Sequence, residues 1–215
     1  SQATLAVITI LASLVGVGSI AVFQLAFNLQ SIPLAVVGLS YSVAAFPTMA
    51  EMIVKKERVV FFDHLVSAAR HIIFWTLPMS VLFIVLRAHI VRVVLGAGQF
   101  GWGDTRLTAA SLALFAVGIV AQSLGALFVR AFYAIGNTRV PLVVHAVSAA
   151  GTICLAVFFV AVLKDAERIG RTFFAMLRVE DIQNSAVLGL PLAYALGACI
   201  NALVLGLSLG WVEGE

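Results

Sequence analysis

Charged residues are scarce in this chain. Only 11% of its 215 residues are Asp, Glu, Lys or Arg, whereas an ordinary soluble domain has about 25%. Hydrophobic residues make up 62%, and the mean hydropathy is +1.12. The 13 basic and 10 acidic residues lie mainly at the ends of apolar runs, where membrane proteins keep their charges. This composition excludes a water-soluble globular domain, a disordered chain and a nucleic-acid-binding chain.

Motifs that carry chemistry are also few. Cys154 and Cys199 are isolated within apolar runs, so they form neither a disulfide framework nor a zinc site. The four histidines have no metal-binding spacing, and no carboxylate pair lies in an apolar run. Residues 96–101 match G-x-G-x-x-G but follow an apolar run instead of a strand, which indicates a flexible turn. The sequence therefore predicts no enzyme, no metal and no cofactor.

Six long apolar runs dominate what is present. Because only helices satisfy their own backbone in lipid over such lengths, the chain is predicted to be an all-α integral membrane protein. We expect a single helical bundle over residues 1–215. The first run is short for a membrane span and the chain starts without a methionine, so a piece of a longer polypeptide is expected. The expected transmembrane segments cover residues 1–15, 20–50, 65–86, 107–129, 140–163 and 186–212.

The second run is too long for a straight span. About 31 helical residues would extend roughly 46 Å, against a bilayer core of about 30 Å. Pro33 and Gly38 lie inside this run, and Pro47 lies near its end. Because proline removes a helical hydrogen bond, a kink near Pro33 is predicted. A loop within residues 24–31 is the alternative division.

The polar segments between the runs do not fix the orientation. Residues 51–64 are predicted to form a charged loop or surface helix, and residues 164–184 contain a predicted helix on the membrane surface. Residues 51–64 and 130–139, with Arg70, carry six basic residues, and the segments on the opposite side carry seven. The positive-inside rule therefore gives no decision.

Polar side chains inside the apolar runs are the candidate site residues. Gln24, Asn28 and Ser31 are spaced i, i+4, i+7, so they share one helix face beside Pro33. Such a face suits a discontinuous helix that lines a cavity. Hydrogen bonding between helices is the alternative interpretation.

Four further residues are candidates for the same cavity. Gln122 and Asn201 are single amides in mid-span, for which a packing role is the alternative. His145 is an ionisable group inside a span, or close to its interface. Arg130 follows an uncharged span directly. Its side chain either extends to the membrane interface or faces a water-filled cavity that receives an anionic substrate.

The order of the motifs resembles the MurJ/MviN family of lipid II flippases, which serve bacterial peptidoglycan synthesis. The segment Ile-Pro-Leu-Ala-Val-Val-Gly at 32–38, with Ala-Phe-Pro-Thr-Met-Ala at 45–50, is similar to a proline-glycine helix of that family. The segment Arg-Ala-Phe-Tyr-Ala-Ile-Gly-Asn-Thr-Arg-Val-Pro at 130–141 resembles its R-x-F-Y-A-x-x-D/N-T-x-x-P junction, and Leu-Gly-Ala-Gly-Gln-Phe at 95–100 resembles a turn between them. The likeness extends over about residues 15–163.

The resemblance implies a MATE-like transporter of two helix bundles, of which this chain is most of the C-terminal one, with the N-terminal bundle missing. It implies alternating-access flipping of a lipid-linked peptidoglycan precursor across the bacterial cytoplasmic membrane, with membrane lipid and the missing bundle as partners. It places residues 51–64 and 130–139 in the cytoplasm. Candidate hinge or structural positions are Pro33, Gly38, Pro47, Gly136, Asn137 and Pro141.

One departure from the family bears on the site. Many members carry an Asp-Arg pair and a Glu before the proline that corresponds to Pro33, where this chain has Phe27, Asn28 and Ser31. The cavity arginine is thus absent from this helix, and the basic residues that the resemblance assigns to the other bundle are the alternative source of pyrophosphate recognition. Two alternatives remain open: an exporter of another lipid-linked oligosaccharide, and a non-transporting membrane scaffold.

Overall fold

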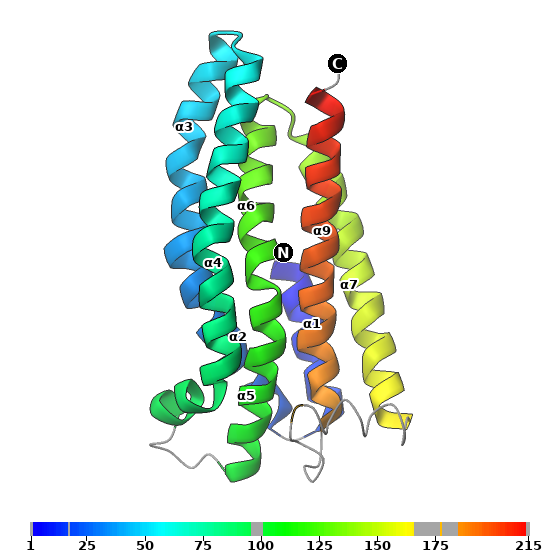
Figure 1. Cartoon of the computed structure of the whole chain (residues 1–215). Helices are drawn as coiled ribbons and strands as arrows, with labels where there is room; N and C mark the ends of the chain where they lie inside the picture. The colour runs from blue at the N-terminus through cyan, green and yellow to red at the C-terminus, as the bar shows by residue number, and fades with distance from the viewer. Residues whose placement is uncertain (1, 17, 96–100, 166–176, 178–184, 214–215) are drawn as a thin grey trace.

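The computed structural model describes residues 2–16, 18–95, 101–165, 177 and 185–213, and within these residues the regular structure is entirely helical. Figure 1 shows the long helices packed side by side in one bundle. The elements in chain order are α1 (Gln2–Val15), α2 (Ser19–Pro33), η1 (Leu34–Leu39), α3 (Ser40–Val54), α4 (Arg58–Leu95), α5 (Trp102–Val117), α6 (Ile119–Ala134), α7 (Arg139–Asp165), η2 (Ser185–Leu188) and α9 (Gly189–Glu213).

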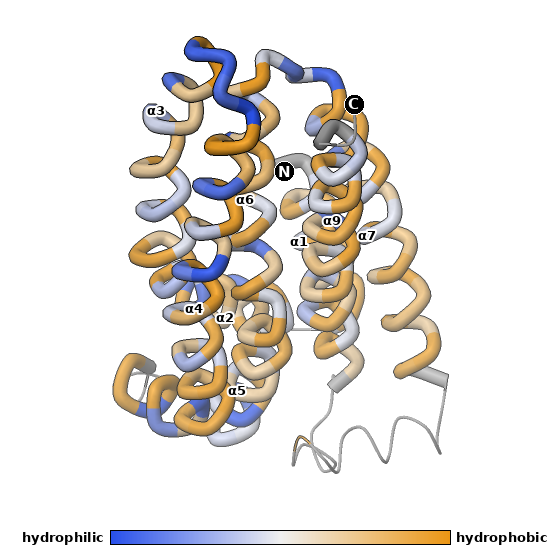
Figure 2. Tube along the Cα trace, turned by 45° about the horizontal axis from the view of Figure 1, so that its top comes forward, coloured by the Kyte–Doolittle hydropathy of each residue, from blue (hydrophilic) through white to orange (hydrophobic). Residues whose placement is uncertain are grey.

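Helices α4, α7 and α9, and the continuous stretch formed by α2, η1 and α3, have the length and composition of membrane spans. The described residues contain four such stretches, and a fifth when α5 and α6 are counted as one span. Figure 2 shows apolar residues along the helices and hydrophilic residues gathered at the α3–α4 and α6–α7 turns. The prediction of an all-α membrane bundle is therefore confirmed. The four stretches are Ser19–Val54, Arg58–Val94, Arg139–Leu163 and Ala186–Trp211.

The distortion expected near Pro33 is a π-helical segment. The chain is α-helical to Pro33, π-helical over Leu34–Leu39 and α-helical again from Ser40. Pro33 has no N–H to donate, and the widened turn that follows leaves carbonyls for side chains: Ser40 Oγ donates to Ala35 O at 3.1 Å and Ser42 Oγ to Gly38 O at 2.5 Å. The alternative of a loop within residues 24–31 is wrong, because α2 passes through them.

The fourth apolar run is not one continuous helix, contrary to expectation. It divides at Gly118 into α5 and α6, whose axes differ by 43°. Gly118 N donates to Phe115 O at 2.9 Å, which tightens the end of α5. A Cβ on Gly118 would come within 3.1 Å of Ala195 Cα on α9. The glycine therefore lets α9 pack against the bend.

Residues 51–64, predicted to form a charged loop or surface helix, are instead mostly the end of α3 and the start of α4. Helix α3 continues to Val54 and α4 begins at Arg58, so the turn is confined to residues 55–57. Lys56 has a φ of 62° there, and Lys55 Nζ lies 2.7 Å from Glu51 Oε1 in an exposed ion pair. The surface helix expected within 164–184 lies outside the described residues, apart from the end of α7 and Leu177.

Two apolar clusters hold the described bundle together. The first joins α1, α2, α4, α5, α7, η2 and α9, with Phe23 and Phe115 fully buried and their ring centroids 5.3 Å apart. The second joins α3, α4, α6, α7 and α9 around Phe61 and Phe132. Because α4, α7 and α9 contribute to both clusters, they connect the α5 end of the bundle to the end that carries the α3–α4 turn (Figure 1).

Candidate functional site

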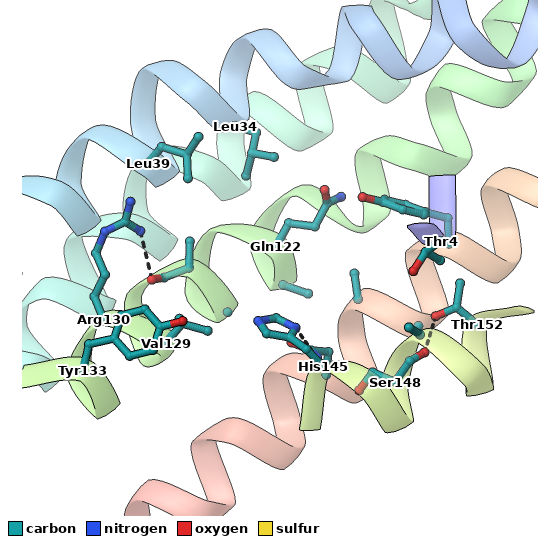
Figure 3. A pocket seen from close by; sticks show the side chains of 18 of the residues that line it. Thr4, Leu34, Leu39, Gln122, Val129, Arg130, Tyr133, His145, Ser148 and Thr152 are labelled. Carbon is teal, nitrogen blue, oxygen red and sulfur yellow. Dashed lines mark hydrogen bonds between the residues drawn. The ribbon is translucent and has the colours of Figure 1, made fainter. Parts of the chain in front are cut away.

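A pocket of about 560 Å³ lies among α1, η1, α3, α6, α7 and α9. We call it the α6 pocket, because α6 supplies more of its lining than any other element. Figure 3 shows Arg130 and Tyr133 at one end, Thr4 and Thr152 at the other, and Gln122 and His145 between them. Its lining side chains able to hydrogen-bond are Thr4, Gln122, Arg130, Tyr133, His145, Ser148, Thr152, Tyr194 and Asn201.

Helical spacing brings these side chains to one cavity. The lining residues of α6, α7 and α9 recur at intervals of three or four, the spacing of a single helix face. Gly125 and Ala126 have little or no side chain, so they leave room for the pocket beside this face of α6. Gly197 allows the close packing of α9 on α7, because a Cβ there would overlap the Thr152 side chain.

Hydrogen bonds connect the pocket to the helices around it. Gln122 Nε2 donates to Oε1 of the fully buried Gln30 at 3.2 Å, which joins α6 to α2. Gln30 Nε2 has no hydrogen-bond partner among the described residues. Asn201 Nδ2 lies 3.1 Å from His145 Nδ1, which joins α9 to α7. These amides therefore connect helices as well as lining a polar space.

Arg130 gives the pocket its one permanent charge among the lining residues. Its Nη1 donates to Ala126 O at 3.0 Å, one turn back in α6. No lining residue is an aspartate or glutamate, and the ion pair found within the described residues is the distant Lys55–Glu51 pair. The arrangement favours an anionic or neutral hydrogen-bonding ligand over a cation.

The structure brings four of the seven predicted cavity residues into one pocket: Gln122, Arg130, His145 and Asn201. The three predicted on the second run do not line it. Gln24 Nε2 donates to Thr9 Oγ1 on α1 at 3.1 Å, Asn28 is exposed, and Ser31 Oγ donates to Asn28 O at 2.7 Å.

Sequence reasoning missed other lining residues. Ser148 and Thr152 follow His145 at i+3 and i+7 and so share its helix face, a signal that was available in the sequence. Gln30 does not line the pocket, but its Oε1 accepts a hydrogen bond from the lining residue Gln122, and it falls outside the 24, 28, 31 pattern. That pattern describes one face of a single helix, and it does not identify the residue of α2 that hydrogen-bonds to α6.

Several candidate hinge residues either pack closely against a neighbouring helix or cap a helix end. A Cβ on Gly38 would overlap the Ser123 side chain of α6. Gly136 has a φ of 84° after α6, and Asn137 Oδ1 accepts from Arg139 N at 3.2 Å and Val140 N at 3.3 Å, which caps α7. Pro141 lies in the first turn of α7 and Pro47 inside an unbroken α3. Their role in motion stays a prediction.

Apolar helices around an internal pocket that contains hydrogen-bonding side chains define an α-helical integral membrane protein. Comparison with known proteins is more specific. The family model described as lipid II flippase MurJ matches residues 1–210. The chain therefore belongs to the MurJ family.

Similar proteins agree with this assignment. A probable lipid II flippase MurJ of Thermotoga maritima is 26% identical over 214 residues, which cover 96% of this chain and 44% of the relative. That of Rickettsia prowazekii is 29% identical over 126 residues, covering 58% and 25%. A structure titled lipid II flippase MurJ, inward closed conformation, matches with a TM-score of 0.72 and 23% identity, covering 95% of this chain and 40% of that one. This chain spans less than half the length of these relatives.

Proposed function

We propose that the protein containing this chain moves a lipid-linked peptidoglycan precursor, lipid II, from the inner to the outer leaflet of the bacterial cytoplasmic membrane for cell-wall synthesis. The family match over residues 1–210 carries this proposal. The chain would supply one of two bundles that rock about a shared cavity, the alternating-access arrangement of many transporters.

The physical task is to move a large polar headgroup through hydrocarbon. An unpaired polar group costs several kcal/mol there, so the path needs water and hydrogen-bonding side chains. The α6 pocket offers amides, hydroxyls and one guanidinium between apolar helices. The polyprenyl tail can remain in lipid throughout. No bond is made or broken in this process, so the proposed activity is transport and not catalysis.

Two sets of polar residues would take part. Gln122, Arg130, His145 and Asn201 would line the path within this bundle. Gln24, Asn28 and Ser31 would line the part of the cavity shared with the second bundle, to which the exposed Asn28 is suited. The π-helical segment after Pro33, together with Gly38, would let α2 and α3 change their relative direction, since irregular helical turns are common at moving or functional sites.

Neighbouring alanines on α7 provide a direct test. Ala149 lines the pocket, whereas Ala150 is exposed and does not. In the full-length protein expressed as sole flippase, we expect Ala149→Trp to fill the pocket and abolish the appearance of lipid II in the outer leaflet. Ala150→Trp should leave it intact. The measurement is leaflet accessibility of lipid II to an external enzyme, with protein level in the membrane as control.

The outcomes separate the alternatives. If the Ala149→Trp variant still transports lipid II, the headgroup does not pass through the α6 pocket. A wild-type protein that supports cell-wall synthesis without exposing lipid II would favour a scaffold, and exposure of a different lipid-linked oligosaccharide would favour another export substrate. Gln24→Leu and Asn28→Leu test the shared-cavity residues by the same assay, and loss of lipid II exposure is expected for both.

A further inference from the structure

The feature with the most specific chemistry is the end of the α6 pocket that holds Arg130. Among the described residues, its guanidinium has a single hydrogen-bond acceptor, the carbonyl of Ala126 at 3.0 Å. A guanidinium has five N–H donors in a planar fork. No acidic residue lines the pocket, so the positive charge is not neutralised from within it. The remaining donors are therefore suited to an anionic group of a ligand.

The surroundings of Arg130 favour a single negative charge. It lies one turn before α6 ends at Ala134, and the carbonyls of a helix C-terminus carry partial negative charge. The other lining residues include no lysine or second arginine. A pyrophosphate carries more than one charge and is normally held by several cations or by backbone N–H groups. This end of the pocket provides neither, so it is poorly suited to a pyrophosphate.

A carboxylate fits the same features. The planar fork of arginine matches the two oxygens of a carboxylate and binds them in parallel. Tyr133 lies beside Arg130 at this end of the pocket, and Gln122 and His145 lie further along it (Figure 3). Phenol, amide and imidazole groups pair with peptide amides and with hydroxyls. The pocket thus presents one carboxylate partner followed by neutral hydrogen-bonding partners.

We infer that the Arg130 end of the α6 pocket binds a carboxylate of the precursor's peptide, and that the pyrophosphate is bound elsewhere. This inference rests on the proposed function, since it assigns one part of the lipid II headgroup to this pocket. Arg130 is then a specificity-determining residue: it distinguishes precursors with a free peptide carboxylate from those in which that group is amidated.

Binding by the purified full-length protein tests the inference with three probes. These are lipid II with free peptide carboxylates, lipid II with those carboxylates amidated, and polyprenyl pyrophosphate, which has neither sugar nor peptide. The variants are Arg130→Gln and Arg130→Lys. Arg139→Gln is the matched control, because Arg139 is exposed at the start of α7 and does not line the pocket.

Arg130→Gln should weaken binding of free-carboxylate lipid II by about tenfold or more, the usual effect of losing a hydrogen bond to a charged group. Binding of amidated lipid II and of polyprenyl pyrophosphate should stay within about twofold, which also reports that the variant is folded. Arg130→Lys keeps the positive charge but lacks the planar fork, so its affinity for free-carboxylate lipid II should lie between those of the wild type and Arg130→Gln. This variant provides the same test if Arg130→Gln is unstable. Arg139→Gln should match the wild type with all three probes.

Two results would overturn the inference, and they differ from failure of the proposed function. Equal loss with free and amidated lipid II would mean that Arg130 does not contact a carboxylate. Loss of polyprenyl pyrophosphate binding would mean that Arg130 binds the pyrophosphate and not a carboxylate. A wild-type protein that binds none of the three probes would instead overturn the proposed function, and the carboxylate subsite with it.

Discussion

Two long apolar stretches each contain proline, yet they differ in shape. Helix α4 runs for 38 residues through Pro78 as one α-helix. The stretch Ser19–Val54 changes to a π-helix directly after Pro33. Of the most apolar 18-residue segment of α4 only 11% is buried within the bundle, against 39% of the corresponding 18-residue segment of Ser19–Val54. The irregular turns are thus found where a helix packs inside the bundle.

The contacts at the irregular turns explain the difference. Gly38 in η1 packs against Ser123 of α6, and Gln30 of α2 accepts a hydrogen bond from Gln122 of α6. The bend at Gly118 lies just before these α6 residues and is itself supported from α4, where Ser80 Oγ donates to Ala116 O at 2.5 Å. Proline alone therefore does not decide where a helix is distorted. Close packing and hydrogen bonds between neighbours do.

The largest expected effect comes from filling the η1–α6 contact. Gly38→Val should destabilise the protein by about 3 kcal/mol, because the new side chain overlaps Ser123 and forces η1 away from α6. Gly151→Val is the matched control, since a Cβ at Gly151 meets nothing within 4 Å. The measurement is the free energy of unfolding in detergent. Equal effects at the two glycines would contradict this account, and partial recovery by Ser123→Gly would support it.

A smaller effect is expected from the amide pair. Gln122→Leu leaves the fully buried Gln30 without its partner and should cost about 2 kcal/mol, the typical penalty for an unsatisfied buried polar group. The double variant Gln30→Leu, Gln122→Leu should recover most of that loss. A double-mutant cycle on unfolding free energies measures the coupling, and additive effects would show that the two amides are independent.

The support given to the Gly118 bend is expected to contribute less. Ser80→Ala removes the hydrogen bond to the α5 carbonyl and should cost about 1 kcal/mol. Ser208→Ala is the control, because its hydroxyl donates to Val204 O within its own helix on an exposed face. Thermal unfolding of the two variants side by side is sufficient. A Ser80 variant that unfolds at the wild-type temperature would mean that the bend needs no support from α4.

How far the sequence predicted this structure depends on how local each feature is. Composition and run length were sufficient for the membrane class. The bend at Gly118 could not be foreseen, because the neighbours in contact with it, Ala195 on α9 and Ser80 on α4, are distant in sequence. For the same reason the 24, 28, 31 pattern did not predict which residue of α2 meets the pocket side of the bundle. Gln122 and Asn201 were identified because a lone amide in an apolar run is informative without knowledge of its neighbours.

The smallest effect is expected from replacing the prolines, which tests whether proline or packing causes the helix distortion. Pro33→Ala and Pro78→Ala should each change the unfolding free energy by no more than about 1 kcal/mol, because a restored hydrogen bond is offset by greater freedom of the unfolded chain. Leu34–Leu39 should stay π-helical in the first variant, held by Gly38 packing and by the Ser40 and Ser42 hydroxyls. Hydrogen exchange of this segment checks the expectation. Conversion to a regular α-helix would assign the distortion to the proline.

The pairing of His145 with Asn201 has a consequence for biosynthesis. The two residues are 56 positions apart in the chain, and a ribosome adds about 5–20 residues per second. The imidazole on α7 is therefore made roughly 3 to 11 seconds before its partner on α9. Until α9 arrives, this polar group must be held by water, by the insertion machinery or by other helices. This contact between α7 and α9 therefore forms only after α9 has been made.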